Sequence, residues 1–203
     1  MNKVKILIFA VIIVIIISTT FALTNYDTQT NEIGITALLA KQRADEIAHD
    51  WNQNATLISL YTYSNMIDNG TYSNWRFSYV VTEFFVQDEG GPLTTDYNTP
   101  CLNVLLFSDG RNISITESGR YVWQVISDFQ IDSDQAYQIA ITNNTINSFV
   151  LEKNTESPGY QMLNLSGNVT WEIEFYRNSQ REVQISILID AMTGEIMSVN
   201  RYD

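Results

Sequence analysis

The sequence has 203 residues and carries 11 lysines and arginines against 23 aspartates and glutamates, a formal net charge of −12. This acidity disfavours nucleic acid as a partner, because its phosphates attract the opposite sign. The single cysteine, Cys101, excludes an intramolecular disulfide, and we expect it to lie buried in a strand as a small apolar residue.

The N-terminus has the features of an export signal. Two lysines precede an unbroken apolar run at residues 6–17, and a short polar exit follows. Two interpretations stay open: residues 1–23 are a retained signal anchor that spans the membrane through residues 6–23, or a signal peptide cleaved near Ala22. The lysines predict that the N-terminus stays inside. We therefore expect a single-pass protein of the cell membrane with its body outside, or a secreted protein after cleavage.

The exported body is more acidic than the whole chain. Two lysines and no acidic residue precede residue 24, so the body has nine basic and 23 acidic residues, a net charge of −14. Such a surface keeps the body soluble and favours a cationic partner over anionic lipid.

The first half of the body predicts one helix followed by strands. Residues 24–31 are polar and form a spacer, and alanines spaced by three and four residues predict a helix at 32–51. A polar loop with Gly90-Gly91-Pro92 is expected at 87–100. β-Branched and aromatic runs, separated by the turns Asp68-Asn69-Gly70 and Asp109-Gly110, predict strands at 56–63, 75–79, 102–107 and 113–115.

The second half repeats this order of elements. Asp132 and Gln135 form a capping box that starts a helix. Alternating residues predict strands at 171–175, 183–189 and 195–200, with a tight turn at 190–194. The repeat aligns Ala44-x-x-Ile47-Ala48 with Ala136-x-x-Ile139-Ala140, Trp75-x-Phe77-x-Tyr79 with Trp171-x-Ile173-x-Phe175, and Ser108-Asp109-Gly110 with the turn that ends at Gly194.

These patterns predict an α+β fold of two tandem modules, at 32–120 and 121–203. Each module is one helix packed on an antiparallel β-sheet, and a hydrophobic N-terminal helix precedes both. The loop at 87–100 is then an insertion in the first module.

Residues 132–203 resemble a PepSY domain. The resemblance rests on the capped helix, on the strand Trp171-Glu172-Ile173-Glu174-Phe175, and on the ending Ile187-Leu188-Ile189-Asp190-Ala191-Met192-Thr193-Gly194-Glu195-Ile196. The first module is PepSY-like but departs from the pattern in its shorter turn and its insertion. The family occurs in propeptides of secreted metallopeptidases, where it inhibits or assists folding, and in membrane-anchored envelope proteins of bacteria. The resemblance therefore implies non-enzymatic binding and transfers no catalytic residue.

Candidate chemical sites are few. Asp132-Ser133-Asp134 lacks the glycine and distal glutamate of a calcium loop. Glu172 and Glu174 point to one side of a strand, where the alternation favours a solvated sheet face over a glycosidase pair. His49, the single histidine, is expected at the surface, and no nucleophile elbow or phosphate loop is present. We therefore expect no catalytic residue, metal or cofactor. Glycosylation sequons occur at Asn54, Asn69, Asn112, Asn143, Asn164 and Asn168.

Two functions remain. The first is a non-enzymatic extracytoplasmic protein-binding module of PepSY type, which regulates a peptidase or another envelope protein through the edges or the exposed face of a sheet. The alternative is a structural, glycosylated cell-surface protein without a dedicated partner. Deleting the loop at 87–100 abolishes partner capture under the first interpretation and changes nothing under the second.

Overall fold

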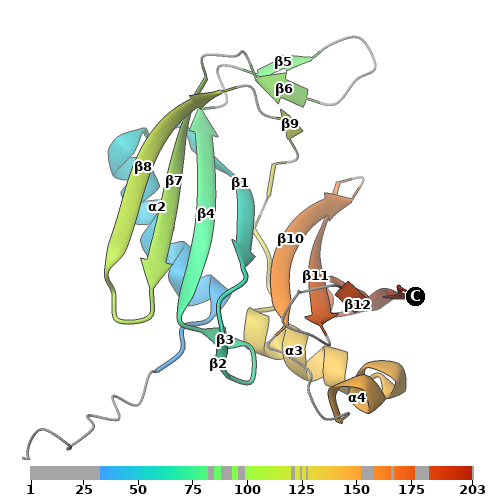
Figure 1. Ribbon diagram of the computed structural model, residues 1–203. Helices are drawn as coiled ribbons and strands as arrows, with labels where there is room; N and C mark the ends of the chain where they lie inside the picture. The colour runs from blue at the N-terminus through green and yellow to red at the C-terminus, as the bar shows by residue number, and fades with distance from the viewer. Residues whose placement is uncertain are drawn as a thin grey trace, which may run out of the picture. The chain divides into compact units, whose positions relative to one another are not determined.

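A long antiparallel β-sheet with helices packed on one of its faces forms the fold (Figure 1). The computed structural model describes residues 33–81, 85–87, 93–95, 99–119, 122–123, 125–126, 128–151, 158–165, 167–176 and 183–202. The N-terminal hydrophobic segment and the spacer at 24–31 lie outside these residues. No helix within the described ranges is long and apolar enough to cross a membrane.

The sheet has eight strands in the order β13-β12-β11-β10-β1-β4-β7-β8, and every neighbouring pair is antiparallel. Its strands are β1 (Ala55–Thr62), β4 (Asn74–Val81), β7 (Thr99–Phe107), β8 (Asn112–Gly119), β10 (Gly159–Leu165), β11 (Asn168–Tyr176), β12 (Val183–Asp190) and β13 (Ile196–Arg201). Short strands form two further sheets: β2 (Met66–Asp68) with β3 (Thr71–Tyr72), and β5 (Phe85–Gln87), β6 (Leu93–Thr95) and β9 (Val122–Trp123).

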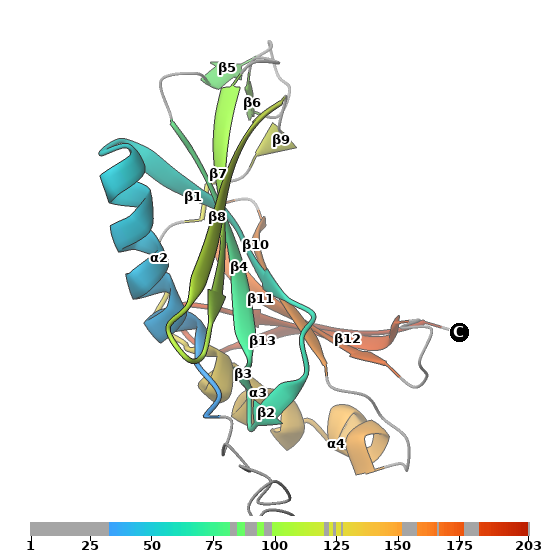
Figure 2. The same cartoon turned by 60° about the vertical axis from the view of Figure 1, so that its left-hand side comes forward.

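Three helices occur in the described part of the chain: α2 (Ala37–Trp51), α3 (Ser133–Thr142) and α4 (Asn144–Leu151). Figure 2 shows α2 running beside the half of the large sheet formed by β1, β4, β7 and β8. Helix α2 contacts β1, β4 and β7, whereas α3 contacts β11 and β12. The strand residues beneath the helices are large and buried, and the facing helix residues are mostly alanines. Small residues let each helix backbone approach the sheet closely, so the large aromatic rings are buried between helix and sheet.

The two halves of the sheet meet at a short seam between β1 and β10. Only two residue pairs join these strands, Tyr61 with Gln161 and Thr62 with Tyr160. Further along, Val125 and Ile126 are hydrogen-bonded to the two halves. There the Ile126 amide donates to the Leu57 carbonyl at 3.0 Å, and the Asn164 side-chain amide donates to the Val125 carbonyl at 2.7 Å. The sheet is therefore continuous through the two β1–β10 pairs, and Val125 and Ile126 add hydrogen bonds to each half.

The two halves share one distinctive hydrogen bond. The indole N–H of Trp75 donates to the Ile35 carbonyl at 2.9 Å, and that of Trp171 donates to the Ile131 carbonyl at 2.7 Å. In each case the acceptor precedes a helix and lies 40 residues before the tryptophan. Both indoles are fully buried and pack against each other at 6.1 Å between ring centroids.

This geometry corrects the predicted alignment of the helices. A shift of 96 residues superposes the two tryptophans and their acceptors. It also matches the buried helix residues Ala37, Ala40 and Ala44 with Ser133, Ala136 and Ala140. The sequence-based alignment of Ala44 with Ala136 was therefore wrong by four residues. The error is one helical turn, which leaves the apolar periodicity nearly unchanged.

The N-termini of α2 and α3 meet at Asp132. Its carboxylate caps α3 together with Gln135, as the capping box predicted, and it also accepts the Leu38 amide of α2 at 2.9 Å. Ser133 is buried, and its hydroxyl accepts the Ala37 amide at 3.0 Å. Thr36, the N-cap of α2, makes no side-chain capping bond of its own. The start of α3 therefore satisfies two of the free amides at the start of α2.

Asp132→Ala is expected to lower the free energy of unfolding by about 2 kcal/mol, because one carboxylate caps two helices. Asp134→Ala is the matched control. Among the described residues, this neighbouring carboxylate accepts a hydrogen bond from the adjacent Gln135 amide of the same helix, so the substitution should cost well under about 1 kcal/mol. Urea denaturation of the full-length chain in detergent measures both. Equal losses in the two variants would contradict the double-capping role.

Several predicted boundaries changed. The helix expected at 32–51 begins at Ala37, because Ile35 forms a β-bridge with Tyr72. Helix α4 was not predicted. The expected loop at 87–100 contains β6, which pairs with β5 and β9. The turns at Gly70, Gly110 and Gly194 are confirmed, each with a positive φ that favours glycine.

Candidate binding surface

The face of the sheet opposite the helices is defined by strand alternation. Trp75, Phe77 and Tyr79 point toward α2 and are buried, so Arg76 and Ser78 point the other way. We name this side the open face. One complete row of it crosses all eight strands, in the order Ile113, Leu105, Arg76, Tyr61, Gln161, Glu172, Leu188 and Ser198.

A groove of about 460 Å³ lies on the open face over β4, β7 and β8. Its apolar lining includes Leu105 and the exposed Ile113 and Ile115, which are 50% and 53% accessible. Polar side chains form a ladder across it: the Ser78 hydroxyl donates to Asn103 at 2.8 Å, and the Asn103 amide donates to Glu117 at 3.3 Å. Because its exposed isoleucines adjoin each other and satisfied polar groups, this groove is the candidate binding surface.

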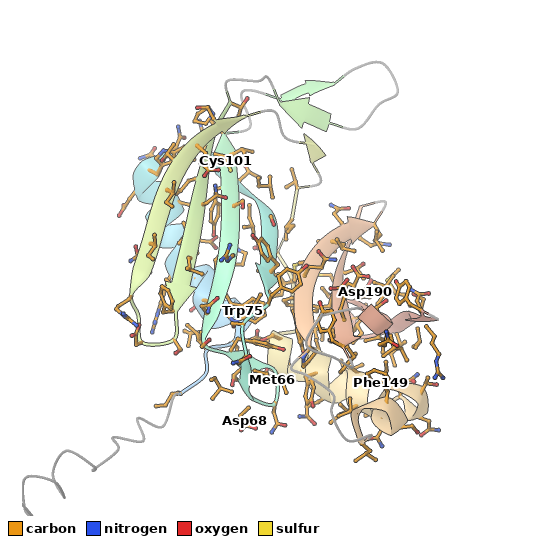
Figure 3. All side chains as sticks on the ribbon, viewed as in Figure 1. Met66, Asp68, Trp75, Cys101, Phe149 and Asp190 are labelled. Atoms are coloured by element: carbon orange, nitrogen blue, oxygen red, sulfur yellow. The ribbon has the colours of Figure 1, made fainter. Side chains whose placement is uncertain are left out.

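At one end of the sheet, the residues of the open face are buried. Ile58, Val80 and Cys101 form a small buried cluster there, separate from the main core. Cys101 is 1% accessible, which confirms the predicted buried strand cysteine. Cys101 on β7 and Trp75 on β4 lie at opposite ends of this pair of strands (Figure 3). Among the residues that line the groove, the exposed apolar side chains are Ile113 and Ile115 on β8.

The carboxylates singled out in the sequence lie on the open face of the other half. Glu172 accepts a hydrogen bond from the Gln161 amide at 2.6 Å, and Glu174 accepts one from the Tyr176 hydroxyl at 2.6 Å. Burial raises the pKa of Glu172, the charge of Glu174 raises it further, and the Gln161 bond opposes the rise. Both acids are partly buried side chains of a regular strand, held by neighbours on the same face.

Glu172 should make stability depend on pH. Because its pKa is raised in the folded state, its protonated form contributes stability that is fully present below the pKa of a free glutamate, about 4.3. That contribution is lost as the pH rises through the raised pKa. Glu172→Gln is therefore expected to show a smaller fall in Tm between about pH 4 and about pH 7. Thermal unfolding across this range tests it, with Glu117→Gln as the control for losing one charge from the open face. Parallel wild-type and Glu172→Gln curves would contradict it.

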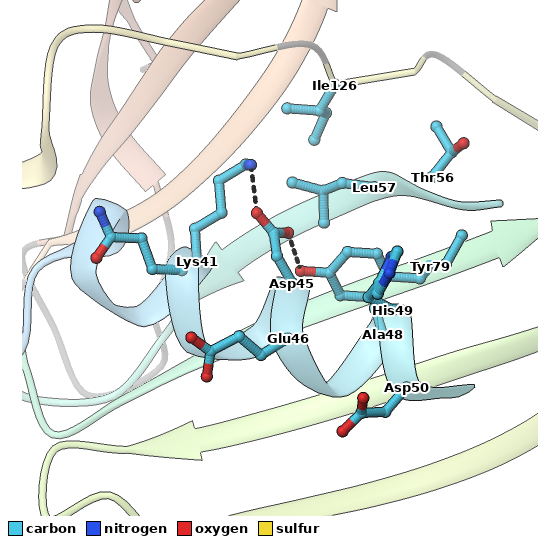
Figure 4. A pocket seen from close by; sticks show the side chains of 12 residues that line it. Lys41, Asp45, Glu46, Ala48, His49, Asp50, Thr56, Leu57, Tyr79 and Ile126 are labelled. Carbon is cyan, nitrogen blue, oxygen red and sulfur yellow. Dashed lines mark hydrogen bonds and ion pairs between the residues drawn. The ribbon is translucent and has the colours of Figure 1, made fainter. Parts of the chain in front are cut away.

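A second hollow, of about 600 Å³, lies on the helix side, against α2 and β1 (Figure 4). Lys41 lies 2.7 Å from one oxygen of Asp45, and the Tyr79 hydroxyl donates to the other at 2.7 Å. Burial raises the pKa of Tyr79, and the charge of Asp45 raises it further, so the phenol stays a hydrogen-bond donor. Both oxygens of Asp45 are engaged, and the cluster ties α2 to β4.

The other residues considered from the sequence do not converge. His49 is exposed on α2, as predicted. The carboxylate of Asp132 is occupied by helix capping, and no metal-binding group of histidine, cysteine or carboxylate residues occurs among the described residues. The sequence did not reveal the groove at Ile113 and Ile115, because exposed isoleucines alternating with polar residues have the same pattern as a strand with one buried face.

The sequons are spread over turns, helix ends and strand starts. Asn54, Asn69, Asn112 and Asn168 are exposed. Asn143 caps α4 by accepting the Thr145 amide, and Asn164 uses both ends of its amide group, donating to Val125 and accepting from Gly167.

The chain was compared with known proteins by sequence and by fold. No curated protein sequence matches the chain. A crystal structure of a candidate lipoprotein from Clostridium difficile 630 superposes with a TM-score of 0.46 and 12% identity, covering 88% of this chain and 99% of that chain. Residues 130–200 match the family described as the peptidase propeptide and YPEB domain, PepSY. The segment from the start of α3 to β13 is therefore similar to the PepSY family.

Proposed function

We propose that the protein is a non-enzymatic, extracytoplasmic protein-binding module that regulates a peptidase or another envelope protein. The match of residues 130–200 to PepSY carries this proposal, because that family is associated with peptidases and their propeptides. The exported location rests on the signal-like sequence at residues 1–23, which is either an anchor or a cleaved signal.

The body is proposed to consist of two tandem modules of the same design. Helix α2 precedes β1, β4, β7 and β8, and α3 precedes β10, β11, β12 and β13, with each set of strands adjacent in the sheet. The duplicated tryptophan hydrogen bonds and the shared buried helix positions support a common origin. The first module supplies the exposed isoleucines, whereas the matched PepSY segment lies in the second.

The groove at Ile113 and Ile115 is the proposed contact surface. Chemical crosslinking in native membranes tests it, followed by recovery of the full-length chain through a C-terminal tag. Ile115→Arg places a charge in the groove, and Thr116→Arg places one at the next exposed position of β8, on the opposite face. We expect one envelope protein or peptidase to be recovered with the wild type and with Thr116→Arg, and to be lost with Ile115→Arg.

The same experiment covers the alternative, a structural glycosylated surface protein. Recovery of only glycans and abundant surface proteins, in equal amounts from all three forms, would contradict a dedicated partner and favour that structural role.

A further inference from the structure

The two edges of the eight-stranded sheet differ in how they are protected. β13 has six residues, and its pairing with β12 shifts register between Leu188 and Ile189. β8 has eight residues and pairs with β7 without any register shift. The β8 sequence, Asn-Ile-Ser-Ile-Thr-Glu-Ser-Gly, contains no lysine or proline and a single charge. Natural edge strands usually carry lysine, proline, several charges or a bulge that prevents pairing with a further strand. By these sequence and register criteria, β8 is an unprotected edge.

The hairpin between β7 and β8 determines which backbone groups of β8 point outward. The Gly110 amide donates to the Phe107 carbonyl at 3.0 Å, and the Phe107 amide donates to the Arg111 carbonyl at 2.9 Å. The backbone carbonyl of Arg111 therefore points toward β7. Because backbone direction alternates along an antiparallel strand, the N–H and C=O groups of Ser114 and Thr116 point away from β7, out of the sheet edge. Among the strands that the structure describes, β8 pairs only with β7, so these groups have no described strand partner and can pair with a strand of another polypeptide.

The side chains beside this edge suit a strand as ligand. Ile113 and Ile115 stand on the open face next to the groove, where they can pack against alternate residues of an added strand. The backbone would supply hydrogen bonds and the isoleucines apolar contact, which are the two components of binding by strand addition.

The negative charge of the body favours a basic strand as the ligand of β8. The body carries −14, and the open face presents Glu117, Glu172 and Glu174 against Arg76 and Arg111, of which Arg111 is paired with Asp109. A second copy would bring an equal negative charge to the interface, whereas a basic segment is attracted. We infer that β8 binds an extended, basic segment of a partner polypeptide as a ninth strand of the large sheet. This inference rests on the proposed function.

Proline substitution tests the backbone contact separately from side-chain contacts. Thr116→Pro removes an outward amide and leaves the hydrogen bonds to β7 in place. Thr116→Val keeps the amide and controls for the lost hydroxyl. Arg201→Pro is the matched control on β13: the Tyr202 amide points inward to Gln184, so the Arg201 amide points outward.

The probe is a displayed library of random 12-residue peptides, selected against the full-length chain in nanodiscs of neutral lipid. We expect the selected peptides to be net positive with alternating apolar residues, and to slow hydrogen exchange of residues 112–119. Their affinity should fall at least tenfold with Thr116→Pro and stay within twofold with Thr116→Val and Arg201→Pro.

Three results would overturn the inference. They are acidic or neutral selected peptides, equal binding to Thr116→Pro, and a wild-type dimer that Thr116→Pro dissociates, which would make a second copy the occupant. If the partner recovered from membranes binds Thr116→Pro normally but not Ile115→Arg, the proposed function stands and only strand addition fails.

Discussion

Trp171→Ala is expected to lower the free energy of unfolding by about 4 kcal/mol, one of the largest effects of any single substitution in this chain. The indole is fully buried, and its ring centroid lies 5.4 Å from that of Phe129 and 6.0 Å from that of Tyr160. Truncation removes these contacts, leaves a cavity and deprives the Ile131 carbonyl of its donor. Chemical denaturation of the full-length chain in detergent, followed by circular dichroism, measures the loss.

Trp171→Phe separates packing from hydrogen bonding. Phenylalanine keeps most of the apolar contact but cannot donate to Ile131, so a loss of about 1–2 kcal/mol is expected. Trp75→Ala should resemble Trp171→Ala, because its indole donates to Ile35 in the equivalent arrangement. A loss below about 1 kcal/mol for either alanine variant would show that the paired tryptophans do not hold the two halves together.

Gly70→Ala is expected to cost about 3 kcal/mol. Gly70 has a φ of 86°, and a Cβ atom there would lie 2.5 Å from the Ser133 carbonyl oxygen and 2.7 Å from the Asp134 Cα. Both are backbone atoms at the start of α3, so the β2–β3 turn could not keep its position against that helix.

Gly167→Ala controls for the backbone conformation alone. Gly167 has a φ of 93°, and its added Cβ would meet nothing within 4 Å. This variant should therefore lose only about 1 kcal/mol, the cost of an alanine with positive φ. Urea denaturation of both variants measures the difference. Equal losses would mean that close packing against α3 contributes nothing.

Local sequence patterns predicted the elements that depend on local physics. The capping box at Asp132, the glycine turns and the alternation around Trp75 and Trp171 each specify a backbone conformation within a few residues. The mixed helix and antiparallel strand composition followed from them. The start of α2 was wrong because Ile35 pairs with Tyr72, a residue 37 positions away that local periodicity does not detect.

The arrangement of the halves and the binding surface depend on long-range pairing. Nothing in the sequence indicates that Tyr61 faces Gln161, so the continuous sheet could not be predicted. Nor could the sequence distinguish the two isoleucines of β8 from buried strand residues, because their exposure follows from the position of β8 at an edge. The acids Glu172 and Glu174 were placed correctly on one face because strand alternation alone decides it.

The binding role of the open face is tested most directly by the dissociation constant between the full-length chain in nanodiscs and the partner recovered by crosslinking. Wild type and Thr116→Arg should bind with the same affinity, and Ile115→Arg should bind at least tenfold more weakly, because its charge would be buried in an apolar contact. Equal dissociation constants for wild type and Ile115→Arg would contradict binding through the open face.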